Sequence, residues 1–278
     1  MRTTPRLIGV IHLGPLPGAP GVKNRDPAIQ LDQVGTLAVR EAQVLVRAGF
    51  EGLIIENFGD EPFYASRVPP ETVAAMSIIA ATVRETARGI PVGVNILRND
   101  AASALAVAAV AGCDFIRVNI LSGVAATDQG IIEGTAATLI RERSRLNANR
   151  IGIFADVLVK HARPLSGESI ELAIEEAALR AGADAVIVTG ATTGRPVDLA
   201  KLKRARQASR HCAVPLYIGS GATPETLFDL FQLADGVIVG SALRSRGKAG
   251  APLDSKRVAS MVKAFRKAVA TRGKWTRN

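Results

Sequence analysis

Short runs of hydrophobic residues alternate along the chain with longer segments that mix hydrophobic and polar residues. Eight of the short runs predict strands, at residues 7–11, 52–56, 91–95, 115–119, 151–156, 185–189, 216–219 and 236–239. Most of them are continuously apolar rather than alternating, which is typical of parallel strands that are covered on both faces.

The longer segments between these runs have the spacing of amphipathic helices. They predict helices at 32–48, 70–88, 100–111, 135–147, 168–181, 198–210, 224–233 and 255–270. In the helix at 224–233, Thr223 is the expected N-cap and Pro224 the first helical residue. Glycines 49, 112 and 182 each follow the last helical residue, where a left-handed C-cap is common. Eight strand–helix units without a break in composition predict a single (β/α)8 TIM barrel over residues 1–278.

Three connections are long enough to form walls of a functional site. Residues 13–32, 56–70 and 122–134 follow the first, second and fourth predicted strands. Loops that follow the strands lie at the C-terminal mouth of such a barrel, where active sites are built.

Polar side chains gather where the predicted strands end. Arg117 and Asn119 are two residues apart, so they point to the same side, and the barrel interior near the mouth suits them better than the helix-covered outer face. The candidates for contacts with a substrate are Asn57, Asn95, Arg117, Asn119 and Thr189. Because strands in a barrel end at one face, these groups are expected to converge on one site.

The strongest acid–base candidate is Asp156, which is followed closely by Lys160 and His161. A carboxylate beside two cationic groups could move a proton, or the three could form only local salt bridges. His12 and Glu56 would complete proton transfer. The competing interpretations are that His12 bonds its own loop and that Glu56 forms a structural ion pair with Arg117. No ligand spacing supports a metal site, and we expect neither a metal nor a cofactor.

Two glycine turns close the seventh and eighth predicted strands. They supply Gly219, Ser220 and Gly221 in the first turn, and Gly240 and Ser241 in the second, which opens a short helix. Small residues expose backbone N–H groups, and this position in a barrel is a common phosphate site. The alternative is that parallel strands simply need tight exits, which glycine supplies.

Composition and charge fit a globular chain of 278 residues, with 47% hydrophobic residues and only two cysteines, far apart. Eight of the ten excess positive charges lie after Asp254, in the last helix and tail at 255–278. A solvated helix explains them, and peripheral contact with an anionic membrane is the alternative. Without interleaved aromatic residues we expect no nucleic-acid partner. We expect no signal peptide, a cytoplasmic location and a homo-oligomer.

Eight phrases in order along nearly the whole chain carry a resemblance to a known family. They are HLGPLPGAPG, IIENFGDEPF, VGVNILRNDA, FIRVNI, TDQGIIEG, DVLVKHARPL, VTGATTG and IGSGATPE. Together they resemble the BtpA/SgcQ family, which implies a barrel related to the ribulose-phosphate-binding group. Some members are tied to accumulation of photosystem I, and others look like enzymes of sugar metabolism.

These residues favour an enzyme that acts on a phosphorylated sugar or nucleoside-like substrate by isomerase or lyase chemistry. Hydrolysis of a glycosidic or phosphate bond is the second enzymatic hypothesis. A non-catalytic assembly factor of the BtpA type, using the basic C-terminal helix, is the hypothesis from another class.

Overall fold

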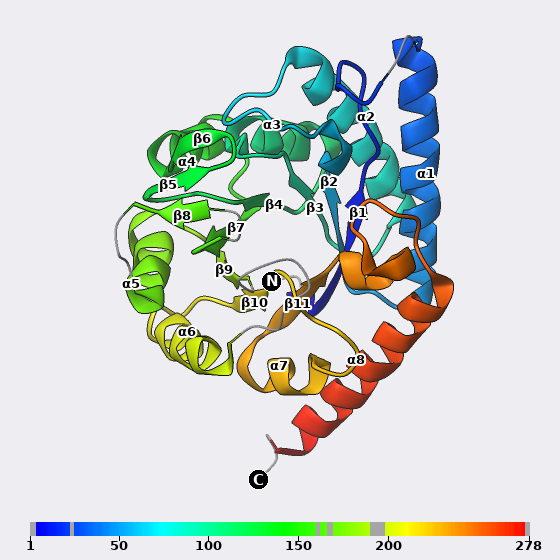
Figure 1. Cartoon of the computed structure of the whole chain (residues 1–278). Coiled ribbons are helices and arrows are strands. Elements are labelled where there is room, and N and C mark those ends of the chain that lie inside the picture. The colour runs from blue at the N-terminus through cyan, green and yellow to red at the C-terminus, as the bar shows by residue number, and fades with distance from the viewer. Residues whose placement is uncertain (1–3, 23–24, 160–161, 166–168, 190–197, 276–278) are drawn as a thin grey trace.

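The computed structural model describes residues 4–22, 25–159, 162–165, 169–189 and 198–275. Eight parallel strands form a closed barrel with helices around it (Figure 1). In barrel order they are β1 (Leu7–His12), β2 (Gly52–Glu56), β3 (Val92–Asn95), β4 (Phe115–Val118), β7 (Gly152–Val157), β9 (Ala185–Val188), β10 (Leu216–Ile218) and β11 (Gly236–Val239), which pairs back with β1. The predicted (β/α)8 barrel is confirmed.

The outer helices follow the predicted order. They are α1 (Pro27–Ala48), α2 (Pro70–Thr86), α3 (Ala101–Ala111), α4 (Ala136–Arg145), α5 (Ile170–Glu175), α6 (Leu199–His211), α7 (Leu227–Leu233) and α8 (Ser255–Trp275). Short helical turns add η1 (Phe58–Asp60), η2 (Glu176–Arg180), η3 (Ser241–Leu243) and η4 (Ser245–Gly247). The three predicted glycine caps, Gly49, Gly112 and Gly182, all have positive φ.

Two predicted helix starts were wrong, for local reasons. Helix α1 begins at Pro27, because the Asp26 side chain accepts hydrogen bonds from the N–H groups of residues 28 and 29 and Pro27 fits the first turn. Helix α7 begins at Leu227 rather than Pro224. The Thr223 carbonyl and hydroxyl instead accept hydrogen bonds from Thr226, which close a separate turn.

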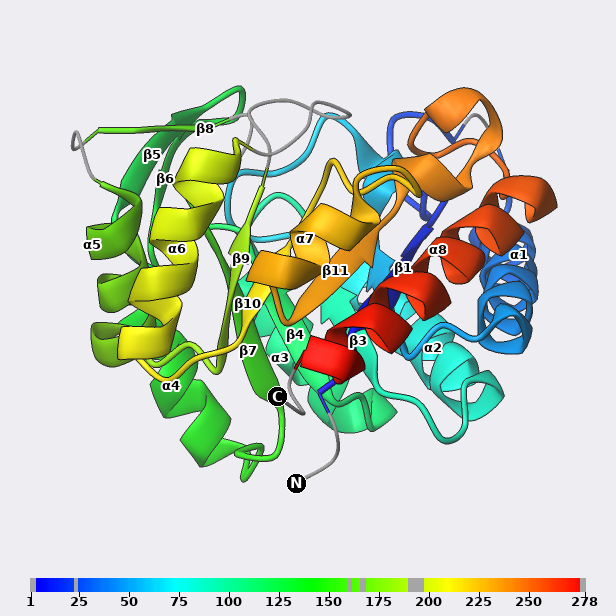
Figure 2. The same cartoon turned by 90° about the horizontal axis from the view of Figure 1, so that it is seen from below.

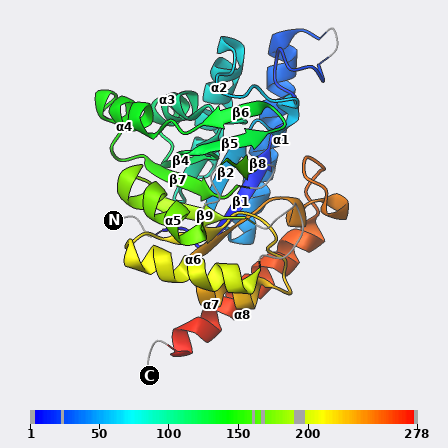
Figure 3. The same ribbon diagram turned by 60° about the vertical axis from the view of Figure 1, so that its left-hand side comes forward.

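The connection after β4, predicted as a loop, contains a β-hairpin. Strands β5 (Val124–Thr127) and β6 (Gly130–Glu133) pair antiparallel, and β5 also pairs with β8 (Ala162–Pro164). Figure 2 shows this small sheet at one end of the barrel, and Figure 3 brings its three strands forward beside α4 and α5. Ala125 of β5 and Ile132 of β6 are buried in a small cluster with Ile120 and Val159, so one face of the sheet is covered.

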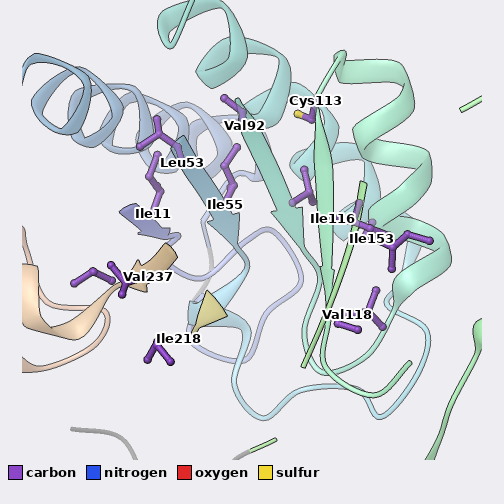
Figure 4. Packing of buried hydrophobic residues seen from close by; sticks show 14 of the residues in the cluster. Ile11, Leu53, Ile55, Val92, Cys113, Ile116, Val118, Ile153, Ile218 and Val237 are labelled. Atoms are coloured by element: carbon purple, nitrogen blue, oxygen red, sulfur yellow. The ribbon is translucent and has the colours of Figure 1, made fainter. Parts of the chain in front are cut away.

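Alternate residues of the barrel strands build two separate cores. Side chains such as Ile11, Leu53 and Ile116 point outward and pack under the helices (Figure 4). The inward residues form a second cluster, in which the Phe115 and Phe154 rings lie 4.5 Å apart between centroids. Because both layers are filled, the lower barrel is a packed core and polar groups are confined to its mouth.

Helix α8 is part of the fold rather than an appended tail. Val258, Met261, Val262, Phe265 and Ala268 are buried against the rest of the chain. Both cysteines are buried and free. Within the described residues, none of the helices combines the length and hydrophobicity that a membrane span requires.

Candidate functional site

A buried guanidinium lies at the centre of the polar residues in the barrel mouth. Arg117 on β4 donates from Nε and Nη2 to Asp156 Oδ2 and Oδ1, at 2.9 and 3.1 Å, and from Nη1 to Glu56 Oε1 at 3.1 Å. The structure thus contains the ion pair between Glu56 and Arg117, which the sequence left open as an alternative to a catalytic role for Glu56. Burial opposes the charge on Arg117, but the two carboxylates outweigh it and raise the pKa of Arg117 above its usual value.

Two asparagine amides complete this network. Asn119 Nδ2 donates to Asp156 Oδ2 at 2.9 Å, and Asn95 Nδ2 donates to Glu56 Oε1 at 3.1 Å. One carboxylate oxygen of Glu56 is therefore held by two donors. This arrangement fixes the orientation of the carboxylate and directs its second oxygen, Oε2, toward His12.

His12 and Glu56 face each other beside the cavity. His12 Nε2 lies 3.9 Å from Glu56 Oε2, and both side chains are almost buried. The Gly250 N–H donates to His12 Nδ1 at 3.3 Å, and the imidazole ring packs on Phe58 with centroids 4.6 Å apart. A neutral imidazole that accepts at Nδ1 carries its proton on Nε2, the nitrogen nearest Glu56.

A cavity of about 260 Å³ opens next to these groups. Its lining includes predicted residues from both sides of the mouth: His12, Glu56, Asn95, Arg117, Asn119, Gly219, Ser220, Gly221, Gly240 and Ser241. The two glycine turns therefore lie at the same cavity as the carboxylate and the imidazole. Five of the polar strand-end candidates thus line one cavity: His12, Glu56, Asn95, Arg117 and Asn119.

Glycine is sterically required at two positions in this wall. A Cβ atom on Gly219 would lie 2.6 Å from Ile187 and 3.3 Å from the Arg117 guanidinium. A Cβ atom on Gly240 would lie 2.9 Å from the His12 ring. The two glycines, each the first residue after β10 or β11, thus leave room for the polar network.

The two turns also present backbone donors. In the described part of the chain, the N–H groups of Gly221, Ala222, Ser241 and Ala242 have no hydrogen-bond acceptor. All four residues line the cavity. Several N–H groups around one space are the usual means of binding an anion without a charged side chain.

Some predicted site residues lie elsewhere. The Asp156 side chain has no exposed area and does not line the cavity. It binds Arg117 rather than facing the cavity. Asn57 is fully buried and bonds the Leu97 N–H at 2.7 Å, which ties two loops together. Thr189 is also buried and does not line the cavity. Lys160 and His161 lie outside the described residues.

The sequence reasoning missed three contributors to the cavity. Arg98 lines it from the loop after β3, and burial lowers the pKa of its guanidinium. Asp128 reaches it from the turn of the β5–β6 hairpin, and Phe58 supports His12. The Asp-Gln-Gly turn between two short apolar runs was the available signal for the hairpin. Among the described residues, no three His, Cys, Asp or Glu side chains form a metal-binding group.

The fold and the mouth define the class of the protein: a single (β/α)8 barrel with a polar site at the C-terminal ends of its strands. The chain belongs to the BtpA family, whose sequence profile matches residues 3–267. It is 43% identical over 259 residues to the photosystem I biogenesis protein BtpA of Synechocystis. The aligned region covers 93% of this chain and 87% of that protein. An uncharacterised protein of Pyrococcus horikoshii is 46% identical over 243 residues, or 87% and 88% of the two chains.

Solved structures share the fold at low sequence identity. N-(5'-phosphoribosyl)anthranilate isomerase from Pyrococcus furiosus matches with a TM-score of 0.55 and 13% identity, covering 94% of this chain and 99% of that one. Thiamine phosphate pyrophosphorylase from the same organism matches with a TM-score of 0.54 and 16% identity, covering 83% and 90%. These likenesses support the barrel fold.

Proposed function

We propose that this protein is an enzyme that binds a phosphorylated, sugar- or nucleoside-like molecule and moves a proton next to a carbonyl group. The observation that carries the proposal is one cavity with anion-binding N–H groups on one side and a Glu56–His12 pair on the other. A pure scaffold has no physical need for this arrangement. The structurally similar isomerase and pyrophosphorylase are both named for phosphorylated compounds, which agrees with the proposal.

The phosphate would rest between the two glycine turns. The N–H groups of Gly221, Ala222, Ser241 and Ala242 would donate to its oxygens. The carbonyl end of the substrate would then extend toward His12 and Glu56. Asn95 and Asn119 line the same cavity and would hold hydroxyl or carbonyl oxygens.

Glu56 is the group best placed to take the proton. Oε1 is held by Arg117 and Asn95, whereas Oε2 faces His12. A carboxylate removes a proton from the carbon next to the carbonyl, and the Nε2–H of neutral His12 donates to the carbonyl oxygen as negative charge develops. The resulting enediolate reacts in one of two ways. In an isomerase, protonated Glu56 delivers its proton to the former carbonyl carbon, while the hydroxyl proton of the adjacent carbon passes through His12 to the enediolate oxygen, so that the carbonyl moves by one carbon. In a lyase, the enediolate re-forms the carbonyl and expels a leaving group from the β-carbon, and the leaving group takes the proton from Glu56.

Asp156 has a positioning role in this proposal. It holds the Arg117 guanidinium through two hydrogen bonds, and Arg117 in turn holds Glu56. Lys160 and His161 remain candidates, from the sequence alone, for a second acid–base pair. Hydrolysis of a glycosidic or phosphate bond is the alternative reaction, and release of free sugar or inorganic phosphate would favour it.

Ligand-induced thermal shifts test the binding step. Ribose 5-phosphate and other sugar phosphates are compared with the corresponding free sugars. We expect the phosphorylated member of at least one pair to raise the Tm, because bound ligand stabilises the folded state. Ser241→Asp places a negative charge at the phosphate site and should abolish the shift. Ser245→Asp, a few residues away and outside the cavity lining, is the matched control. Equal shifts for both members of every pair would contradict the proposal.

A second candidate, a biogenesis factor that contacts a membrane through α8, is favoured by the 43% identity to BtpA and by the exposed cations of this helix. Deletion of residues 255–278 would remove buried core residues, so it cannot test this idea cleanly. The triple variant Lys256→Ser, Lys263→Ser and Lys267→Ser changes only exposed positions. Sedimentation with anionic vesicles that is lost in this variant would support the factor. No sedimentation of the wild type would exclude lipid contact of this kind.

A further inference from the structure

The outer face of α1 carries a row of exposed residues that is complementary to itself. Ala28, Asp32, Thr36, Arg40 and Val44 are spaced by four residues and are all exposed. Residues at this spacing form one of the ridges by which helices pack. We call these five residues the α1 ridge. Reversing its direction about Thr36 exchanges Asp32 with Arg40 and Ala28 with Val44.

We propose that the α1 ridge, with the neighbouring face of α2, is the contact through which two copies of this chain form a symmetric dimer. A two-fold axis at Thr36 would place Asp32 of each copy opposite Arg40 of the other. The opposite relative direction of the two helices would bring like charges together, so the charges select one arrangement.

Neither charge has a partner within its own chain to compete with this contact. In the described structure, Asp32 and Arg40 form no ion pair and no side-chain hydrogen bond. They lie eight residues apart, about 12 Å along a helix, so they do not pair with each other. On the adjacent ridge of the same helix, by contrast, the charged residue Glu41 already has a partner in its own chain, because Arg244 donates hydrogen bonds to it.

The ridge borders a groove whose walls include exposed apolar side chains. A groove of about 600 Å³ runs between α1 and α2, with Gly35 and Val39 on one wall and Ile78 on the other. Ile78 is 55% exposed and Leu37, beside the ridge, is 59% exposed. Small residues near the crossing point, Gly35 and Thr36, allow close approach of two helices.

The available area is adequate for a specific dimer. Helices of 22 and 17 residues are roughly 33 and 25 Å long, and each is about 10 Å wide. Together they present on the order of 600 Å² per copy, close to the roughly 800 Å² per partner of a standard interface. Figure 1 shows α1 and α2 on the outside of the barrel, and none of the residues that line the groove lines the cavity at the mouth. The dimer therefore does not depend on the proposed reaction.

A charge-reversal cycle followed by sedimentation velocity tests the dimer. The wild type should sediment as a dimer at micromolar concentrations. Asp32→Arg alone and Arg40→Asp alone should each weaken the dimer by at least about tenfold, because each creates two like-charge contacts across the two-fold axis. The double variant should recover the wild-type dissociation constant.

The control is Leu179→Glu, which alters an apolar residue, 65% exposed, on the opposite side of the barrel near α5 and α6. It should leave the dimer intact, and circular dichroism should show that every variant is folded. A wild type that is monomeric at all concentrations would overturn the proposal. So would a double variant that is weaker than either single variant, or dissociation by Leu179→Glu alone.

Discussion

Replacing Arg117 by methionine should destabilise the protein strongly and in a pH-dependent way. The substitution removes three hydrogen bonds and the guanidinium that lies between the carboxylates of Glu56 and Asp156. The side chains of both acids are at most 8% exposed, so solvation compensates only in part for the lost guanidinium.

The expected loss follows from this burial. Breaking a buried ion pair by removing one partner costs about 3–5 kcal/mol, a large share of the 5–15 kcal/mol that stabilises a typical domain. Without Arg117, the two buried carboxylates repel each other, and this repulsion exists only while both are ionised. The difference from wild type should therefore be largest at neutral pH and shrink toward pH 4.

Urea unfolding at pH 4.5, 6 and 7.5 measures this effect. The additional change Asp156→Asn removes one unpaired charge, so the double variant should be no less stable than Arg117→Met alone at pH 7.5. Arg204→Met, which breaks an exposed pair with Glu171, is the control and should leave the midpoint unchanged. A loss below about 1 kcal/mol in Arg117→Met, or a loss independent of pH, would refute the reasoning.

Three further predictions use packing and titration. Gly59→Ala should lower the Tm by several degrees more than Gly14→Ala. A Cβ atom at position 59 would lie 2.4 Å from backbone atoms, whereas one at position 14 would have no neighbour closer than 3.8 Å. Thermal unfolding of both variants tests this difference. Burial raises the pKa of Cys113 to about 12, so the native thiol should resist a disulfide reagent at pH 8 and react only after unfolding; rapid stoichiometric labelling would contradict this. Gly240→Ala should displace the His12 ring, shift its NMR signals and weaken the binding of a phosphate ligand. Unchanged NMR signals would contradict this, because they would show that the added methyl group does not displace the ring.

The barrel could be predicted because its signals are local and repeated. Eight apolar runs, spaced by helices, gave all eight strands to within one or two residues. Asn119 and Arg117 could be placed together because a period of two residues in one strand decides which side they face. The glycine turns could also be placed from the sequence, because counting the predicted strands puts them after the seventh and the eighth.

The contacts across the mouth could not be predicted, because they join residues far apart in the chain. Asp156 has the sequence context of a catalytic acid, yet Arg117, 39 positions away, holds both of its oxygens. Asn57 ends a strand like the other candidates, but a hydrogen bond to the loop after β3 turns it away from the cavity. The hydrogen bond from the Gly250 N–H to His12 Nδ1 spans 238 positions. Contacts between residues so far apart in the sequence form only when the barrel is closed.

The central claim, proton transfer by Glu56 on a phosphorylated carbonyl compound, is tested most directly by exchange with solvent deuterium. A panel of aldose and ketose phosphates is incubated with the protein in D2O and followed by proton NMR. The wild type should replace the hydrogen next to the carbonyl of at least one compound by deuterium, and Glu56→Gln should lose this exchange while still showing the thermal shift with the same compound. Exchange that persists unchanged in Glu56→Gln, or no exchange by the wild type with any compound that it binds, would contradict the account.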